Sequence, residues 1–259
     1  MEKITNGIFI DRWDGIKNTS ATTINARHLE NKRKLLSLVK EKAGVVWAET
    51  DLVLVWARRL VEYKQPLFFL SDTDKLLEII KGSPVPVRII YSGPTGPSEN
   101  YFEQEIKKII GEELQGVGVF LGEYNMELSK ILTSGADVWL NTPMLGTEAC
   151  GTSGMKAALN GVLALSTNDG WVGEVNPEDI GWVTDDSTDN RAMHNILKDE
   201  IIPSFSAHLE SPESSLWTQT MIRARNLILD RFSTTRTLQE YIEKLYIPVM
   251  QQKHTHKID

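Results

Sequence analysis

Short apolar segments alternate with amphipathic segments through the first two thirds of the chain. Uninterrupted apolar runs of strand length predict buried β-strands at 45–48, 52–57, 85–91, 117–122, 136–140 and 162–166. Between them, apolar residues recur at helical spacing and predict helices at 26–43, 72–81, 101–114, 126–133 and 153–160. From about Arg191 onward the pattern is nearly all helical.

This alternation predicts the α/β fold class, as a Rossmann-like doubly wound parallel sheet with helices on both faces. We find no linker that divides the sequence, so residues 1–259 are expected to form a single domain that ends in helices. Doubly wound sheets bind their ligands beyond the carboxyl ends of the strands. The loops that follow the strands at 52–57 and 136–140 are therefore the first places to search for a site.

Composition and charge exclude several classes of partner. A net charge of −7 argues against polyanion binding, so nucleic acid is not an expected partner. The single cysteine, Cys150, cannot form an internal disulfide, and we expect a cytoplasmic protein. We see no leader and no apolar run near the roughly 20 residues that span a bilayer, so no membrane contact is expected. The histidines lack the spacing of metal ligands, and we assign no metal.

The most informative segment is 148–161 (EACGTSGMKAALNG), which follows an apolar strand and opens a helix. It combines a carboxylate (Glu148), a glycine-bracketed turn and a lysine (Lys156). Unpaired backbone N–H groups at a helix start attract phosphate, because the helix dipole is positive there. A lysine in the first turn can reach an aldehyde or a phosphate held at the same place. A glycine-rich loop with one solvated lysine is equally compatible with these residues.

A second group of candidate residues follows the strand at 52–57. The segment 57–64 (ARRLVEYK) carries Arg58, Arg59 and Lys64. An arginine fork and a lysine ammonium that converge are a common means of holding phosphate. Taken alone, a solvated basic loop is the more frequent explanation. Because both groups follow strand carboxyl ends, however, we expect them to face one crevice.

The segment 148–161 closely resembles the pyridoxal-phosphate segment of glycogen and α-glucan phosphorylases. Further similar blocks, in the family's order, are 4–13 (ITNGIFIDRW), 57–64, 120–124 (FLGEY), 136–141 (ADVWLN) and 169–171 (DGW). The resemblance implies the C-terminal half of a GT-B glycosyltransferase fold, with pyridoxal 5'-phosphate as cofactor. The implied reaction is reversible phosphorolysis of an α-1,4-glucan, such as glycogen or maltodextrin, to α-D-glucose 1-phosphate.

The resemblance also implies a role for individual residues. Lys156 would form the Schiff base with the cofactor, and Arg59 and Lys64 would bind the substrate phosphate. Further cofactor contacts would come from Gly151, Thr152, Arg58, Tyr124 and Trp13. The transferred glucose would contact Glu148, Asn6 and Gly151. Without the resemblance, Trp13 and Tyr124 would be interpreted as core aromatics.

Phosphorylases of this type work in a cleft between two domains, and we expect the N-terminal one to be absent here. The hypothesis is a split enzyme that is inactive alone and completed by a separate chain. One alternative is a non-catalytic remnant or a partner-binding subunit. Another is a sugar-nucleotide glycosyltransferase, in which a second glutamate stands at the position of Lys156. A lysine cannot accept hydrogen bonds from ribose hydroxyls, so this position favours a phosphorylase.

Overall fold

The computed structural model describes residues 3–17, 19–20, 22–96 and 100–255. Within these ranges, six strands form one parallel sheet in the order β3-β2-β1-β4-β5-β6. The strands are β1 Leu52–Ala57, β2 Val87–Ser92, β3 Gly118–Leu121, β4 Val138–Asn141, β5 Leu163–Thr167 and β6 Gly181–Thr184. The order reverses between β1 and β4, which makes the carboxyl ends of these two strands the topological switch point of the sheet.

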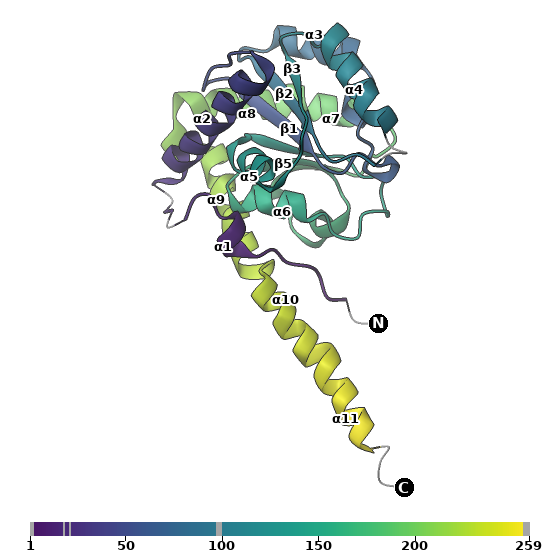
Figure 1. The fold of residues 1–259 in the computed structure, drawn as a ribbon. Helices are drawn as coiled ribbons and strands as arrows, with labels where there is room; N and C mark the ends of the chain where they lie inside the picture. Colours follow the sequence, from purple (N-terminus) through teal and green to yellow (C-terminus); the bar gives the residue numbers. More distant parts are fainter. Residues whose placement is uncertain (1–2, 18, 21, 97–99, 256–259) are drawn as a thin grey trace.

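Helices cover both faces of the sheet (Figure 1). The α-helices are α1 Ile10–Trp13, α2 Ile24–Ala43, α3 Thr73–Gly82, α4 Asn100–Glu112, α5 Met126–Gly135, α6 Thr152–Leu159, α7 Arg191–Ile196, α8 Ile202–Glu210, α9 Leu216–Arg231, α10 Thr234–Tyr241 and α11 Ile247–Thr255. Short 3-10 helices are η1 Glu62–Lys64, η2 Phe68–Leu70, η3 Gly170–Glu174, η4 Pro177–Asp179 and η6 Pro212–Ser214, and π-helical turns are η5 Leu197–Ile201 and η7 Ile242–Tyr246.

The sheet separates two apolar layers because successive strand side chains point to opposite faces. On β1, Leu52, Leu54 and Trp56 join a core with α3, α4 and α8. Val53 and Val55 join the other core, with α2, α5 and α6. All six side chains of β1 are buried, as a strand covered on both faces requires. The predicted doubly wound α/β fold is therefore confirmed.

One predicted strand is absent from the structure, and one observed strand was not predicted. The segment 45–48 forms no strand: Val46 is 73% exposed, while Trp47 is buried beneath the guanidinium of Arg88, 5.8 Å from its ring centroid. Val45 and Trp47 therefore pack against an apolar core without forming a strand of the sheet. The edge strand β6 was missed because its four residues are only half-buried and give a weak apolar signal.

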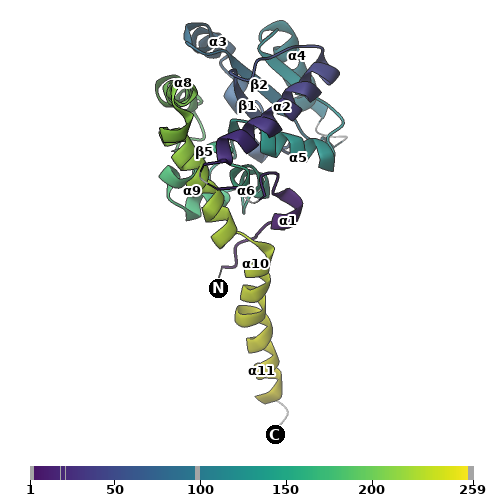
Figure 2. The ribbon, with the colours of Figure 1, turned by 90° about the vertical axis from the view of Figure 1, so that its left-hand side faces the viewer.

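The carboxyl-terminal helices α10 and α11 project from the sheet body as a rod (Figures 1 and 2). The amino-terminal segment runs past the root of this rod. There the N–H of Ile8 donates to the carbonyl of Phe232 at 2.8 Å, and the N–H of Thr234 donates to that of Ile8 at 2.9 Å. Every helix in the described ranges is too short or too polar to span a bilayer.

Candidate active site

A cavity of about 370 Å³ lies at the carboxyl ends of β1 and β4, where the sheet order reverses. Most of the residues singled out in the sequence line it: Asn6, Arg58, Arg59, Lys64, Tyr124, Glu148, Gly151 and Thr152. The two groups of candidate residues, distant in the chain, are thus brought together at one place. Lys156 and Trp13 do not line it; they contact each other, with Lys156 one helical turn beyond Thr152.

Glu148 stands at the centre of the charged cluster. Its Oε2 accepts hydrogen bonds from Arg58 Nη2 and from Lys64 Nζ, each at 2.5 Å. Both cationic residues are buried, with 4% exposure for Arg58 and 8% for Lys64. Burial by itself raises the pKa of Glu148, but the two cations outweigh it and hold that pKa below the ordinary value. Burial also lowers the pKa of Arg58, which Glu148 opposes.

Lys64 is held in place by a residue that the sequence analysis missed. The hydroxyl of Thr142, just beyond β4, donates to the Lys64 carbonyl at 3.0 Å and accepts from Trp56 Nε1 at 2.8 Å. The N–H of Met144 donates to the Tyr63 carbonyl at 2.8 Å. These bonds fix the turn after β1 to the loop after β4.

The start of α6 approaches the charged cluster closely because Gly151 has no side chain. Its φ is +78°, and a Cβ there would lie 3.1 Å from Arg58 Nη2. The neighbouring thiol of Cys150 is buried, and burial raises its pKa to about 11. The thiol is therefore protonated at neutral pH, which fits a small packing side chain better than a nucleophile.

Lys156 lies one helical turn beyond Thr152 on the same face of α6. Its Nζ sits 3.8 Å from the centroid of the Trp13 ring. Among the described residues, this amine has no ion-pair or hydrogen-bond partner. Burial lowers the pKa of Lys156, which favours the neutral, nucleophilic amine.

Asn160, at the end of α6, fixes Trp13 against Lys156. Its Nδ2 donates to the Trp13 carbonyl at 2.9 Å, and its Oδ1 accepts from the N–H of Gly15 at 2.7 Å. Asn160 is fully buried. It falls inside the segment 148–161, yet no side chain near it in sequence pointed to this role.

The lowered pKa of Lys156 predicts an unusual pH profile of chemical labelling. Reductive methylation with formaldehyde should reach half of its maximal rate at a lower pH for Lys156 than for a free lysine side chain, whose pKa is about 10.4. Peptide mass spectrometry at a series of pH values measures this rate, with Nα-acetyl-lysine as the control. A Lys156 profile that coincides with the control would contradict the prediction.

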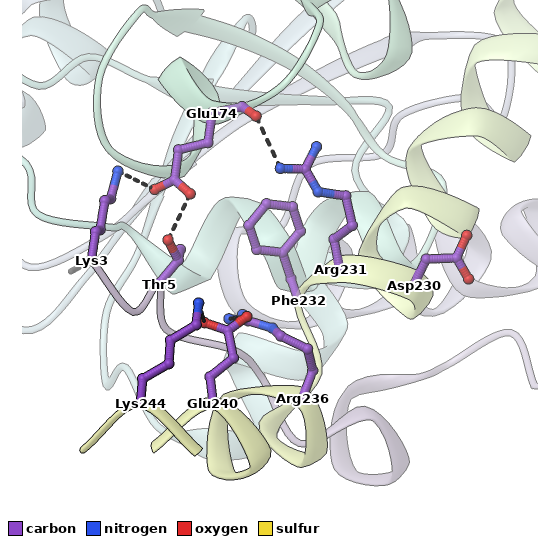
Figure 3. Close-up of a pocket in the computed structure, with 9 residues that line it drawn as sticks. All are labelled: Lys3, Thr5, Glu174, Asp230, Arg231, Phe232, Arg236, Glu240 and Lys244. Atoms are coloured by element: carbon purple, nitrogen blue, oxygen red, sulfur yellow. Dashed lines mark hydrogen bonds and ion pairs between the residues drawn. The ribbon is translucent and has the colours of Figure 1, made fainter. Parts of the chain in front are cut away.

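Asn6 reaches the cavity because the residues around it are anchored. Glu174 accepts from Thr5 Oγ1 at 2.6 Å and pairs with Lys3 at 2.6 Å. Arg236, on α10, donates to the Asn6 carbonyl at 3.2 Å. Figure 3 shows Lys3 and Thr5 directed toward Glu174, where all three line a separate pocket at the root of α10. The amino-terminal segment is thus fixed between η3 and α10.

Arg59 and Tyr124 complete the cavity wall. Arg59 is exposed, unlike its neighbour Arg58. Tyr124 is half-buried, and its hydroxyl donates to Ser129 Oγ at 2.9 Å. Across the described ranges, no group of three or more His, Cys, Asp or Glu side chains could hold a metal ion.

The sheet order and the cationic cavity at its switch point define a Rossmann-like α/β domain with a ligand crevice at the usual place for this class. Comparison with known proteins narrows the class. The model of the carbohydrate phosphorylase family matches residues 16–181. The chain belongs to the carbohydrate phosphorylase family.

The matching relatives are considerably longer than this chain. The chain is 31% identical over 270 residues to glycogen phosphorylase of Aquifex aeolicus. This alignment covers 93% of the chain and 39% of that protein. It is 31% identical over 261 residues to maltodextrin phosphorylase of Thermococcus litoralis, covering 90% of the chain and 31% of that protein. Glycogen phosphorylase of Mycobacterium tuberculosis is 30% identical over 215 residues, covering 77% of the chain and 25% of that protein. The chain therefore spans between a quarter and two fifths of these relatives.

Proposed function

We propose that this domain is the phosphate- and cofactor-binding C-terminal half of an α-glucan phosphorylase with the GT-B architecture. The reaction is phosphorolysis of an α-1,4-glucan to α-D-glucose 1-phosphate. The observation that carries the proposal is the convergence of Arg58 and Lys64 on Glu148 beside the start of α6, in a member of the carbohydrate phosphorylase family.

The residues around α6 fit pyridoxal 5'-phosphate. Lys156 offers a half-buried amine that lacks an ion-pair partner among the described residues, and burial lowers its pKa. Arg58 is buried with its Nε and Nη1 unpartnered among the described residues, which leaves donors for an anion. Gly151 leaves room beside this guanidinium. When bound, the cofactor supplies a phosphate group that exchanges a proton with the substrate phosphate.

The cations of the cavity would make two neighbouring phosphates tolerable. Arg59 and Lys64 bind the substrate phosphate, and Arg58 adds positive charge behind them. Like-charged groups held close together repel, and fixed cations offset that repulsion most strongly where water is excluded. Because Lys64 contacts Glu148, it links the phosphate position to the sugar position.

Glu148 and Asn6 would position the transferred glucose. The low pKa of Glu148 keeps its carboxylate charged, so that it accepts hydrogen bonds from sugar hydroxyls. Asn6 meets the same cavity from the amino-terminal segment, with a side-chain amide that both donates and accepts. Together they define the orientation of the sugar relative to the phosphate.

A further domain is needed to close the cleft and to bind the glucan, and the rod offers a surface for it. Leu238, Ile242, Leu245 and Val249 are between 41% and 57% exposed on α10, η7 and α11. Their spacing places them along one side of the rod, as in an apolar helix–helix seam. We infer that the completing domain, whether part of the same protein or a separate chain, covers this seam.

The central test is covalent labelling of the folded domain. After incubation with pyridoxal 5'-phosphate and reduction with borohydride, peptide mass mapping should find the adduct on Lys156. A Lys156→Arg variant that keeps the wild-type circular dichroism should lose that adduct, because a guanidinium does not condense with the aldehyde at neutral pH. An adduct on another lysine, or none in the folded protein, would leave a role in partner binding as the better explanation.

A further inference from the structure

Asp169 holds the loop that carries Glu148. It follows β5 and caps η3, where its Oδ1 accepts from the N–H of Gly170 at 2.8 Å. Its Oδ2 accepts from the N–H groups of Thr147 at 3.0 Å and of Glu148 at 2.8 Å. One carboxylate therefore receives three backbone N–H groups from two loops. Charge-assisted hydrogen bonds of this kind are stronger than those between neutral groups.

The segment that begins at Asp169 also holds the far side of the Glu148 loop. The N–H of Trp171 donates to the carbonyl of Cys150 at 3.0 Å. Gly170 adopts φ +62°, and a Cβ there would lie 2.5 Å from the same carbonyl. The two loops are therefore joined on both sides of Glu148, by the Asp169 carboxylate before it and by a backbone hydrogen bond after it, with no space for a side chain at Gly170.

The Glu148 loop depends on this contact for its shape. Glu148 lies in neither a helix nor a strand, so no regular backbone ladder sets its conformation. In the described part of the chain, Asp169 is the acceptor that the structure gives to its N–H. A small shift of this backbone would move the carboxylate away from Arg58 and Lys64, since both contacts are direct.

We propose that Asp169 is a positioning residue, which sets the Glu148 carboxylate against Arg58 and Lys64 through its hydrogen bonds to the loop backbone. The importance of that position for sugar binding rests on the proposed function. The position of the Glu148 carboxylate relative to Arg58 and Lys64 does not depend on the proposed function, and it can be tested on the domain without cofactor or substrate.

The test is an NMR titration of Glu148 in Asp169→Ala. The protein carries ¹³C-labelled glutamate carboxyl groups, and the Glu148 signal is assigned by its loss in Glu148→Gln. In the wild type, the two cations hold the pKa of Glu148 low. In Asp169→Ala, the pKa should shift upward toward the ordinary value of about 4.3, because the carboxylate leaves its cations.

The sign of the shift separates positioning from a simple charge effect. Removal of a nearby negative charge lowers the pKa of a carboxylate, so loss of the Asp169 charge alone would move Glu148 downward. Asp169→Asn keeps an oxygen that accepts N–H groups but loses the charge, so the pKa of Glu148 should lie lower in this variant than in Asp169→Ala. If Asp169→Ala does not fold, Asp169→Ser takes its place, because serine can cap η3 but has no carboxylate to bond to the Glu148 loop.

A matched control removes a capping carboxylate elsewhere. Asp72 accepts from the N–H of Lys75 at 3.0 Å at the start of α3. Asp72→Ala should leave the Glu148 titration unchanged. An unchanged or downward-shifted pKa of Glu148 in Asp169→Ala, or in Asp169→Ser where that replaces it, or an equal upward shift in Asp72→Ala, would overturn the proposal. Failure of cofactor labelling at Lys156 would instead bear on the proposed function and leave this titration valid.

Discussion

Replacing Lys64 with methionine is expected to lower glucan phosphorolysis by about 10²-fold or more, the usual cost of removing one electrostatic contact to the reacting groups. Methionine keeps much of the apolar stem of lysine but removes the ammonium that faces Glu148. Under the proposed function the substrate phosphate then loses a cation, while Glu148 keeps its bond to Arg58. The measurement is the initial rate of glucose 1-phosphate release by this chain combined with the domain that completes the cleft.

The matched control for this prediction is Lys42→Met. Lys42 pairs with Glu123 at 3.1 Å at the surface, and exposed pairs of this kind contribute little. The control should retain the wild-type rate. Equal rates for Lys64→Met and Lys42→Met would show that the ammonium in the cavity plays no part in the reaction.

Replacing Asp137 with alanine is expected to destabilise the fold by about 3–5 kcal/mol, the usual effect of breaking a buried ion pair from one side. Asp137 Oδ2 accepts from Lys32 Nζ at 2.6 Å and from the N–H of Val53 at 2.8 Å. Its Oδ1 lies 3.2 Å from His28 Nε2. Without the carboxylate, the ammonium of Lys32 stays buried with the Asp51 carbonyl as its acceptor. Urea unfolding measures the loss.

The lowered pKa of Asp137 also predicts how the free energy of unfolding depends on pH. Burial raises the pKa of Asp137, but Lys32 and His28 outweigh it, so the folded pKa lies below the unfolded one. The stabilisation is then present above the unfolded pKa and is lost as the pH falls through the folded pKa. The acid branch of the stability curve should therefore flatten in Asp137→Ala.

Two controls accompany the Asp137 variant. Glu127→Ala, which breaks an exposed pair with Lys130, should cost less than about 1 kcal/mol. A double variant, Asp137→Leu with Lys32→Met, should recover part of the loss, because it removes both charges of the pair, although the N–H of Val53 still loses its acceptor. A single Asp137→Ala variant as stable as Glu127→Ala would contradict the account of this buried pair.

Local pattern was sufficient for most of the elements. The apolar run at 52–57 is β1 to the residue, since a strand buried on both faces has no polar position to blur its limits. The strand prediction at 45–48 was wrong because a run of four apolar residues is too short to show whether the segment pairs with a neighbouring strand. The half-buried residues of β6 gave only a weak apolar signal, and its place beside β5 depends on pairing that is not local.

The residues of the candidate site likewise divide into those that the sequence could single out and those that it could not. Sequence singled out Glu148, Arg58, Lys64 and Lys156, through motifs at strand ends and through the resemblance to phosphorylases, and their roles stay predictions. It did not locate the residues that hold them. Thr142 bonds to Trp56 across 86 positions, Asn160 to Trp13 across 147, and Asp169 to Glu148 across 21.

The sequence by itself determined the α/β class, most strand and helix positions and the residue types of the site, because each depends on the periodicity or chemistry of neighbouring residues. Only the tertiary structure decided which arginine is buried against Glu148, that Lys156 packs on Trp13, and which polar side chains fix the loops. Those outcomes depend on the sheet order, which brings the ends of β1 and β4 together, and on the free energy of placing each charge beside a partner from another part of the chain.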